Sequence, residues 1–139
     1  MSGMTIHTSI DSEHFINESL NLALEVVTDI LQQIESIKFC SNEHIHFTNL
    51  ELTKISLKIT QFVELTTLTS KFIAIKKNKD VSEIKNSHIH LLFILKGINQ
   101  SQLKRDELVL EDLIKYELKD NLTQWKIDII PKIKKILNS

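Results

Sequence analysis

Apolar residues recur along most of this chain at alternating steps of three and four positions. The recurrence is most regular between residues 11 and 38, where it holds for three heptads. Its members are Ile16, Leu20, Ala23, Val27, Ile30, Ile34 and Ile37. This spacing places side chains on one face of an α-helix that packs against other helices. We therefore expect a helix over residues 11–38, with Asp11 or Ser12 as its N-cap.

Three further stretches carry helical periodicity and predict helices over residues 49–76, 81–103 and 107–130. Thr48 with Glu51, and Asp80 with Glu83, have capping-box spacing, and Asp106 is a candidate cap for the last helix. The apolar positions of the second helix form one drifting face. They are Leu52, Ile55, Ile59, Phe62, Leu65, Leu68, Phe72 and Ile75.

Four helices of this length with short connections predict an all-α fold, an antiparallel four-helix bundle of up-down-up-down topology. Pro131 lacks a backbone amide, so the last helix is expected to kink or to restart as an amphipathic tail over residues 131–137. Residues 1–10 are polar and aperiodic, which predicts a flexible leader before a single domain of residues 11–139. Gly97 lies inside the third helix and predicts close approach of another helix.

Composition narrows the choice of fold further. The 139 residues include two glycines and one proline, whereas an average chain of this length carries about ten and seven. Such scarcity excludes turn-rich β folds and glycine-rich phosphate loops. The single cysteine, Cys40, forms no internal disulfide, and no apolar run is long enough to span a membrane. Both features favour a cytoplasmic protein.

Charge is divided between the two halves of the chain. Residues 1–69 hold three lysines against nine acids, a net charge of −6, and residues 70–139 hold fourteen basic residues against nine acids, a net charge of +5. The simpler interpretation is that an acidic first helix lies beside a basic later one. The alternative is that each face steers a partner. Nine acids in the basic half argue against a nucleic acid as that partner.

Residues with catalytic or metal-binding chemistry form no recognisable constellation, so we assign no catalytic, cofactor or metal site and expect no enzyme. His44 and His46 are close enough to chelate, but no further ligands have the required spacing. His88 occupies a seam position, which predicts a core histidine hydrogen-bonded to a facing threonine or backbone group. The alternatives are a pH-sensitive or partner-contacting histidine, or a small-ligand or metal-binding bundle whose cavity His88 lines with Thr66 or Thr69.

The stretch Asp112-Leu-Ile-Lys-Tyr-Glu-Leu-Lys-Asp-Asn-Leu-Thr-Gln-Trp125 resembles the closing helix of small uncharacterised bacterial helical proteins, some of them associated with flagellar functions. Residues 88–126 comprise part of the third predicted helix, a polar break with an acid, and a last helix that reaches Trp125. In this arrangement they also resemble the flagellin export chaperone FliS family. The resemblance implies a cytoplasmic helical bundle that wraps a disordered partner segment. It implies no catalytic residue.

These observations predict a non-enzymatic helical protein-binding module, a chaperone or adaptor for a bacterial assembly of flagellar type. Its partner is expected to be another protein or a peptide segment. The alternative is a structural homodimer. Apolar residues near the second helix's end, on the last helix and on the tail are the candidate partner-binding residues. They are Phe72, Ile75, Tyr116, Ile133, Ile136 and Leu137.

Overall fold

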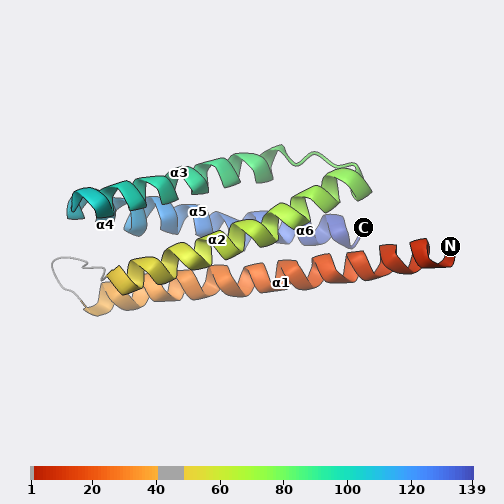
Figure 1. Ribbon diagram of the computed structural model, residues 1–139, viewed down its shortest axis with the longest axis horizontal. Coiled ribbons are helices and arrows are strands. Elements are labelled where there is room, and N and C mark those ends of the chain that lie inside the picture. The colour runs from red at the N-terminus through yellow and green to blue at the C-terminus, as the bar shows by residue number, and fades with distance from the viewer. Residues whose placement is uncertain (1, 41–48) are drawn as a thin grey trace.

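The computed structural model describes residues 2–40 and 49–139, with side chains from residues 12–36 and 50–139. These residues form four long helical rods. The first three rods are α1 (Ser2–Cys40), α2 (Asn49–Phe72) continued by η1 (Ile73–Lys77), and α3 (Ser82–Lys104). The fourth rod is a series of α4 (Glu107–Asp112), η2 (Leu113–Leu118), α5 (Lys119–Gln124), η3 (Trp125–Ile129) and α6 (Ile130–Leu137), where η denotes a π-helical turn. The predicted all-α bundle is confirmed, and Figure 1 shows that successive rods run in opposite directions.

The four rods enclose one core. α1 packs against α2 and against the α5–α6 part of the fourth rod, whereas α3 packs against α2 and against the α4–α5 part. α1 and α3 therefore occupy opposite corners of the bundle. Figure 1 shows α3 along the upper edge and α1 along the lower edge, both running in the same direction.

The seam of α1 packs as its spacing predicts, because the six described members from Ile16 to Ile34 are all buried. The start of the helix differs from the expectation. α1 begins at Ser2, so residues 2–10 are helical, and Asp11 and Ser12 lie inside the helix instead of capping it. Residues 2–10 contain no proline, so nothing prevents the helix from beginning before Ile16, where its apolar seam begins. Thr48, His44 and His46 lie outside the described residues.

The second half of α2 buries different side chains from those that the drifting apolar face predicts. Leu68 and Ile75 are exposed, and the buried line after Phe62 continues through Thr66, Thr69 and Ile73. In an α-helix, each successive step of three residues turns the next side chain further from the core, whereas alternating steps of four and three keep successive side chains on the core face. The two buried hydroxyl groups are satisfied, because each donates a hydrogen bond to a carbonyl one turn earlier.

Gly97 marks a close contact, as predicted. A Cβ atom at this position would lie 3.0 Å from Leu113 Cδ1 of η2. The connection that follows uses Arg105 in the left-handed region, with φ of 55°, and Asp106 then caps α4 by accepting a hydrogen bond from the Val109 amide. The Asp80–Glu83 pair forms no capping box. Asp80 instead accepts hydrogen bonds from the amide and hydroxyl of Ser82, which lower the pKa of its carboxyl.

The tail after Pro131 is part of the bundle core. η3 runs directly into α6, whose second residue is Pro131, and the backbone stays right-handed helical through Ile129 and Ile130, so the rod does not end at the proline. Ile133 and Leu137 are 1 % and 2 % exposed, and α6 contacts α1 and η1. Their assignment to a partner-binding surface is therefore corrected, since the monomer itself covers them.

The charge asymmetry of the sequence is expressed as contacts between the acidic and basic rods. Glu13 of α1 pairs with Lys77 at 3.2 Å, and Glu35 of α1 pairs with Lys119 of α5. Both ion pairs are partly exposed, so each adds little to stability. They do favour the observed neighbours of α1 over other arrangements of the rods.

Candidate functional site

A group of exposed apolar side chains lies in the middle of α3. Ile89 and Phe93 are 66 % and 71 % exposed, and Leu92 beside them is half exposed. Residues three and four apart on a helix are neighbours, so the three side chains form one continuous apolar strip. Scattered exposed apolar residues are ordinary, whereas a contiguous group in a rigid helix marks an interaction surface.

Sequence periodicity missed this apolar strip because it follows only the inward seam. Heptad spacing predicts an inward seam with Leu92 beside it, formed by Ile84, His88, Leu91, Leu95 and Ile98. Ile84, Leu91 and Ile98 are buried and Leu95 is partly buried, whereas Leu92 is exposed, which corrects its placement beside the seam. The signal for the strip was present in the apolar run Leu91–Leu95, which extends over more than one helical turn. Such a run covers every side of a helix, so some of its members have to face solvent.

Beneath the apolar strip, α3 contributes a polar contact to the core. His88 Nε2 lies 2.5 Å from Thr66 Oγ1 of α2. The Thr66 hydroxyl also lies within hydrogen-bond distance of the Phe62 carbonyl, and the tautomer of the imidazole decides which group donates in the His88–Thr66 contact. The predicted pairing of His88 with a facing threonine is confirmed, and the two groups contact each other directly instead of facing a cavity.

An aromatic stack completes the surroundings of His88. Its ring stacks on Trp125 with centroids 5.2 Å apart, and the Phe62 ring meets the indole in a T-shaped arrangement with centroids 5.0 Å apart. Trp125 continues the inward apolar spacing of the last predicted helix, which predicts a core residue, and it is completely buried. One turn earlier, Asn121 donates a hydrogen bond to the Ser87 carbonyl of α3. These specific contacts fix the register of α3 against α2 and the fourth rod.

Burial lowers the pKa of His88 below its ordinary value. The unfolded chain therefore binds a proton at this position more readily than the folded chain, and stability falls as pH drops through about 6.5 and below. We expect the midpoint of urea unfolding to be lower at pH 5 than at pH 8. The His88→Gln variant, which keeps a donor but does not titrate here, should lose part of this dependence.

His14→Gln is the matched control for that measurement. The His14 side chain is 78 % exposed, and its Nε2 lies 4.0 Å from Glu18 Oε1. This variant should keep the full pH dependence of the wild type. If His88→Gln and the wild type lose the same stability between pH 8 and pH 5, the folded chain does not disfavour a charge at position 88.

The predicted partner-binding residues do not form one surface. Ile75 on η1 and Tyr116 on η2 are exposed, whereas Phe72 and Ile136 are half-buried and pack against the core. Ile133 and Leu137 are core residues, as described above. Of the predicted partner-binding residues, Ile75 and Tyr116 are therefore the exposed ones. They lie on different rods, and neither belongs to α3, which carries the apolar strip.

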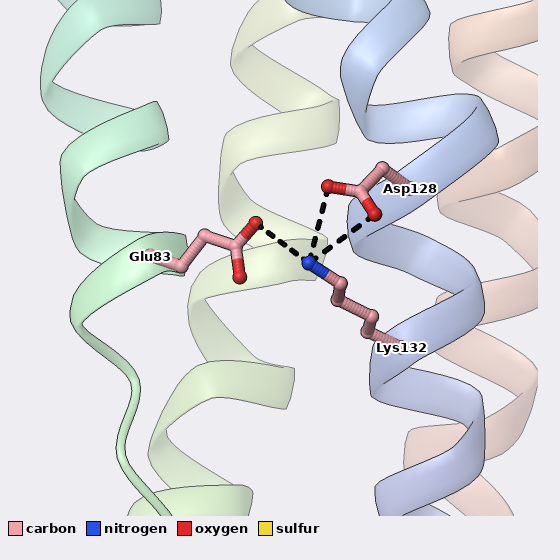
Figure 2. A network of polar contacts seen from close by, with 3 residues as sticks. All are labelled: Glu83, Asp128 and Lys132. Atoms are coloured by element: carbon pink, nitrogen blue, oxygen red, sulfur yellow. Dashed lines mark hydrogen bonds and ion pairs between the residues drawn. The ribbon is translucent and has the colours of Figure 1, made fainter.

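A small polar network joins the tail to α3. Lys132 Nζ lies 3.3 Å from Glu83 Oε1 at the start of α3 and 3.2 Å from Asp128 Oδ1 (Figure 2). Hydrogen bonds to Asp128 and then to Glu83 raise the pKa of Lys132. All three side chains are partly exposed, so the ion pairs add little to the stability of the fold. Their main effect is to fix the position of α6 against the start of α3.

Groups with catalytic potential stay apart in the part of the chain that the structure describes. Within it, no three His, Cys, Asp or Glu side chains are grouped as metal ligands. A surface hollow of about 370 Å³ on α1 is lined by Leu24, Glu25, Thr28 and Asp29. Its polar groups are two carboxylates and one hydroxyl, and these four residues include no histidine, lysine or cysteine. The described helices include none that is long and apolar enough to cross a membrane.

No family model, curated protein or solved structure matched this chain when it was compared with them.

Proposed function

We propose that this chain is a non-enzymatic helical protein-binding module that uses the apolar strip of α3 to hold a helical segment of a protein partner. The exposure of Ile89 and Phe93 beside Leu92 is the observation that carries the proposal. Residues at these spacings match the apolar face of an amphipathic helix laid along α3. Large apolar side chains at the centre of such a contact supply most of its binding energy.

The rest of the bundle suits this role. α3 is held on two sides by α2 and the fourth rod, so the apolar strip lies on a rigid support. A rigid surface loses little conformational entropy when it binds.

A cytoplasmic chaperone or adaptor of a bacterial, flagellar-type assembly is the specific form of the proposal. Its support is the sequence resemblance over residues 88–126, which includes the apolar strip. In this form the partner is a segment that is disordered alone and becomes helical on α3.

Photo-crosslinking from the apolar strip tests the proposal. A photoreactive phenylalanine at position 93, introduced in the cells that produce the protein, should give a defined protein adduct. The same group at Ile127, which is 65 % exposed on the fourth rod, is the matched control and should not give that adduct. Adducts of equal pattern from both positions, or none from position 93, contradict the proposal.

With the partner identified, Phe93→Ala should weaken its binding by about tenfold or more, as expected for a central aromatic contact. Ile127→Ala should leave the affinity unchanged. Because both side chains are mostly exposed, both variants should unfold at the same denaturant concentration as the wild type. Isothermal titration calorimetry measures the first effect, and circular dichroism checks the second.

A further inference from the structure

The outward face of α1 carries an acidic stripe, which consists of Glu18, Leu22 and Asp29. Steps of four and seven residues keep these side chains within about 40° of one line along the helix. All three are exposed. Phe15, one turn before Glu18, is 58 % exposed on the same side. α1 therefore presents Leu22 between Glu18 and Asp29, with the exposed Glu25 on the same line and Phe15 before Glu18.

The outward face of α3 repeats this spacing with the opposite charge. Lys85, Ile89 and Lys96 are exposed at the same steps of four and seven residues, and Ile89 belongs to the apolar strip. Eleven residues of helix span about 16 Å in both cases. When the two faces lie parallel in this register, Glu18 and Asp29 each meet an ammonium group and the leucine on one helix meets Ile89 on the other.

These charges remain available for an external contact. Asp29, Lys85 and Lys96 form no ion pair with any residue of the described chain. Glu83, the one acid in the α3 sequence, is held by Lys132 (Figure 2). Asp80, just before α3, interacts electrostatically with Lys85 without forming an ion pair with it. The outward face of α3 is therefore apolar at its centre and positive at both ends.

Resting on the proposed role of the apolar strip as a docking surface, we propose that its occupant is α1 of a second copy of this chain, bound through the acidic stripe. α1 and α3 lie at opposite corners and run in the same direction (Figure 1), so one copy cannot satisfy both of its own faces. The copies then associate head to tail, as an open row or a ring. Symmetric contacts of α3 with α3, or of α1 with α1, oppose like charges and are disfavoured.

Paired charge reversals test this arrangement in the full-length chain. In analytical ultracentrifugation, the wild type should show a mass that rises with concentration beyond a dimer, and less so at high salt. Lys85→Glu with Lys96→Glu should weaken association at least tenfold, and so should Glu18→Lys with Asp29→Lys. An equimolar mixture of the two double variants should restore association, because each supplies the face that the other lacks.

Lys126→Glu with Lys135→Glu is the control, because it changes net charge equally at two exposed positions on the fourth rod. It should associate as the wild type does. A wild type that stays monomeric at several hundred micromolar, or a mixture that fails to restore association, overturns the self-association. The proposed function survives that result if position 93 still crosslinks one defined protein of a different sequence, and it fails together with the inference if no adduct forms.

Discussion

Replacing Trp125 with alanine is expected to destabilise the bundle by about 3–5 kcal/mol, the usual cost of removing a large aromatic side chain from a core. The indole is completely buried between His88 and Phe62, so its removal leaves a cavity and ends both ring contacts. Since domains of this size are stable by roughly 5–15 kcal/mol, the variant should unfold at a much lower urea concentration. Unfolding should be followed by circular dichroism, because Trp125 is the single tryptophan of the chain and the variant has no tryptophan fluorescence.

Two further variants separate packing from polar effects at this position. The Trp125 Nε1 atom is buried with no hydrogen-bond partner in the described structure, so Trp125→Phe removes an unsatisfied donor while it keeps an aromatic ring. We expect it to lose less than half as much stability as Trp125→Ala. Tyr116→Ala, at an exposed position of the same rod, should change stability by at most about 0.5 kcal/mol. Equal losses for Tyr116→Ala and Trp125→Ala are incompatible with a buried indole.

Ile133→Asp in α6 is expected to cost more than about 3 kcal/mol, because it places a carboxylate in an apolar site with no partner. This variant asks whether the tail belongs to the core or is a separable docking segment. Ile127→Asp makes the same chemical change at an exposed position of η3 and should cost at most about 1 kcal/mol. Urea unfolding followed by circular dichroism compares the two.

The outcome distinguishes two roles for the tail. If Ile133→Asp is as stable as Ile127→Asp but no longer binds the protein partner, the tail is the partner-binding segment that its sequence suggested. If it is strongly destabilised, as the burial of Ile133 and Leu137 indicates, the tail is a structural part of the fourth rod. A destabilised variant should also expose more backbone amides of α1 to hydrogen exchange, since α6 packs on α1.

Sequence periodicity predicted most of the bundle because a helix buries a regular subset of its residues. The seams of α1, α3 and the fourth rod were found from spacing alone, and so was the burial of Trp125. Periodicity was less successful where polar groups replace apolar ones in the core. Thr66 and Thr69 are buried in α2 because their hydroxyls bond to their own helix, and no hydropathy pattern distinguishes them from surface threonines.

The candidate surface was harder to predict than the core. Which apolar residues face outward depends on how neighbouring rods cover each helix, and that information is absent from the spacing within one helix. Ile133 was assigned to a surface because the proline before it suggested a separate segment, whereas packing against α1 and η1 buries it. Ile89 and Phe93 went unnoticed because they lie opposite a well-defined seam.

The π-helical turns give the fourth rod an unusual tolerance of changes in chain length. A π-helical turn corresponds to one extra residue in an otherwise α-helical rod, and the flanking segments stay in phase. Loss of one residue from η2 or η3 would restore an α-helical turn and keep the buried side chains on both sides in place. The same loss in the middle of α3 would rotate every following side chain by about 100° and turn its seam away from the core. Single-residue insertions and deletions among related chains are therefore expected to fall within residues 113–118 and 125–129 of this rod.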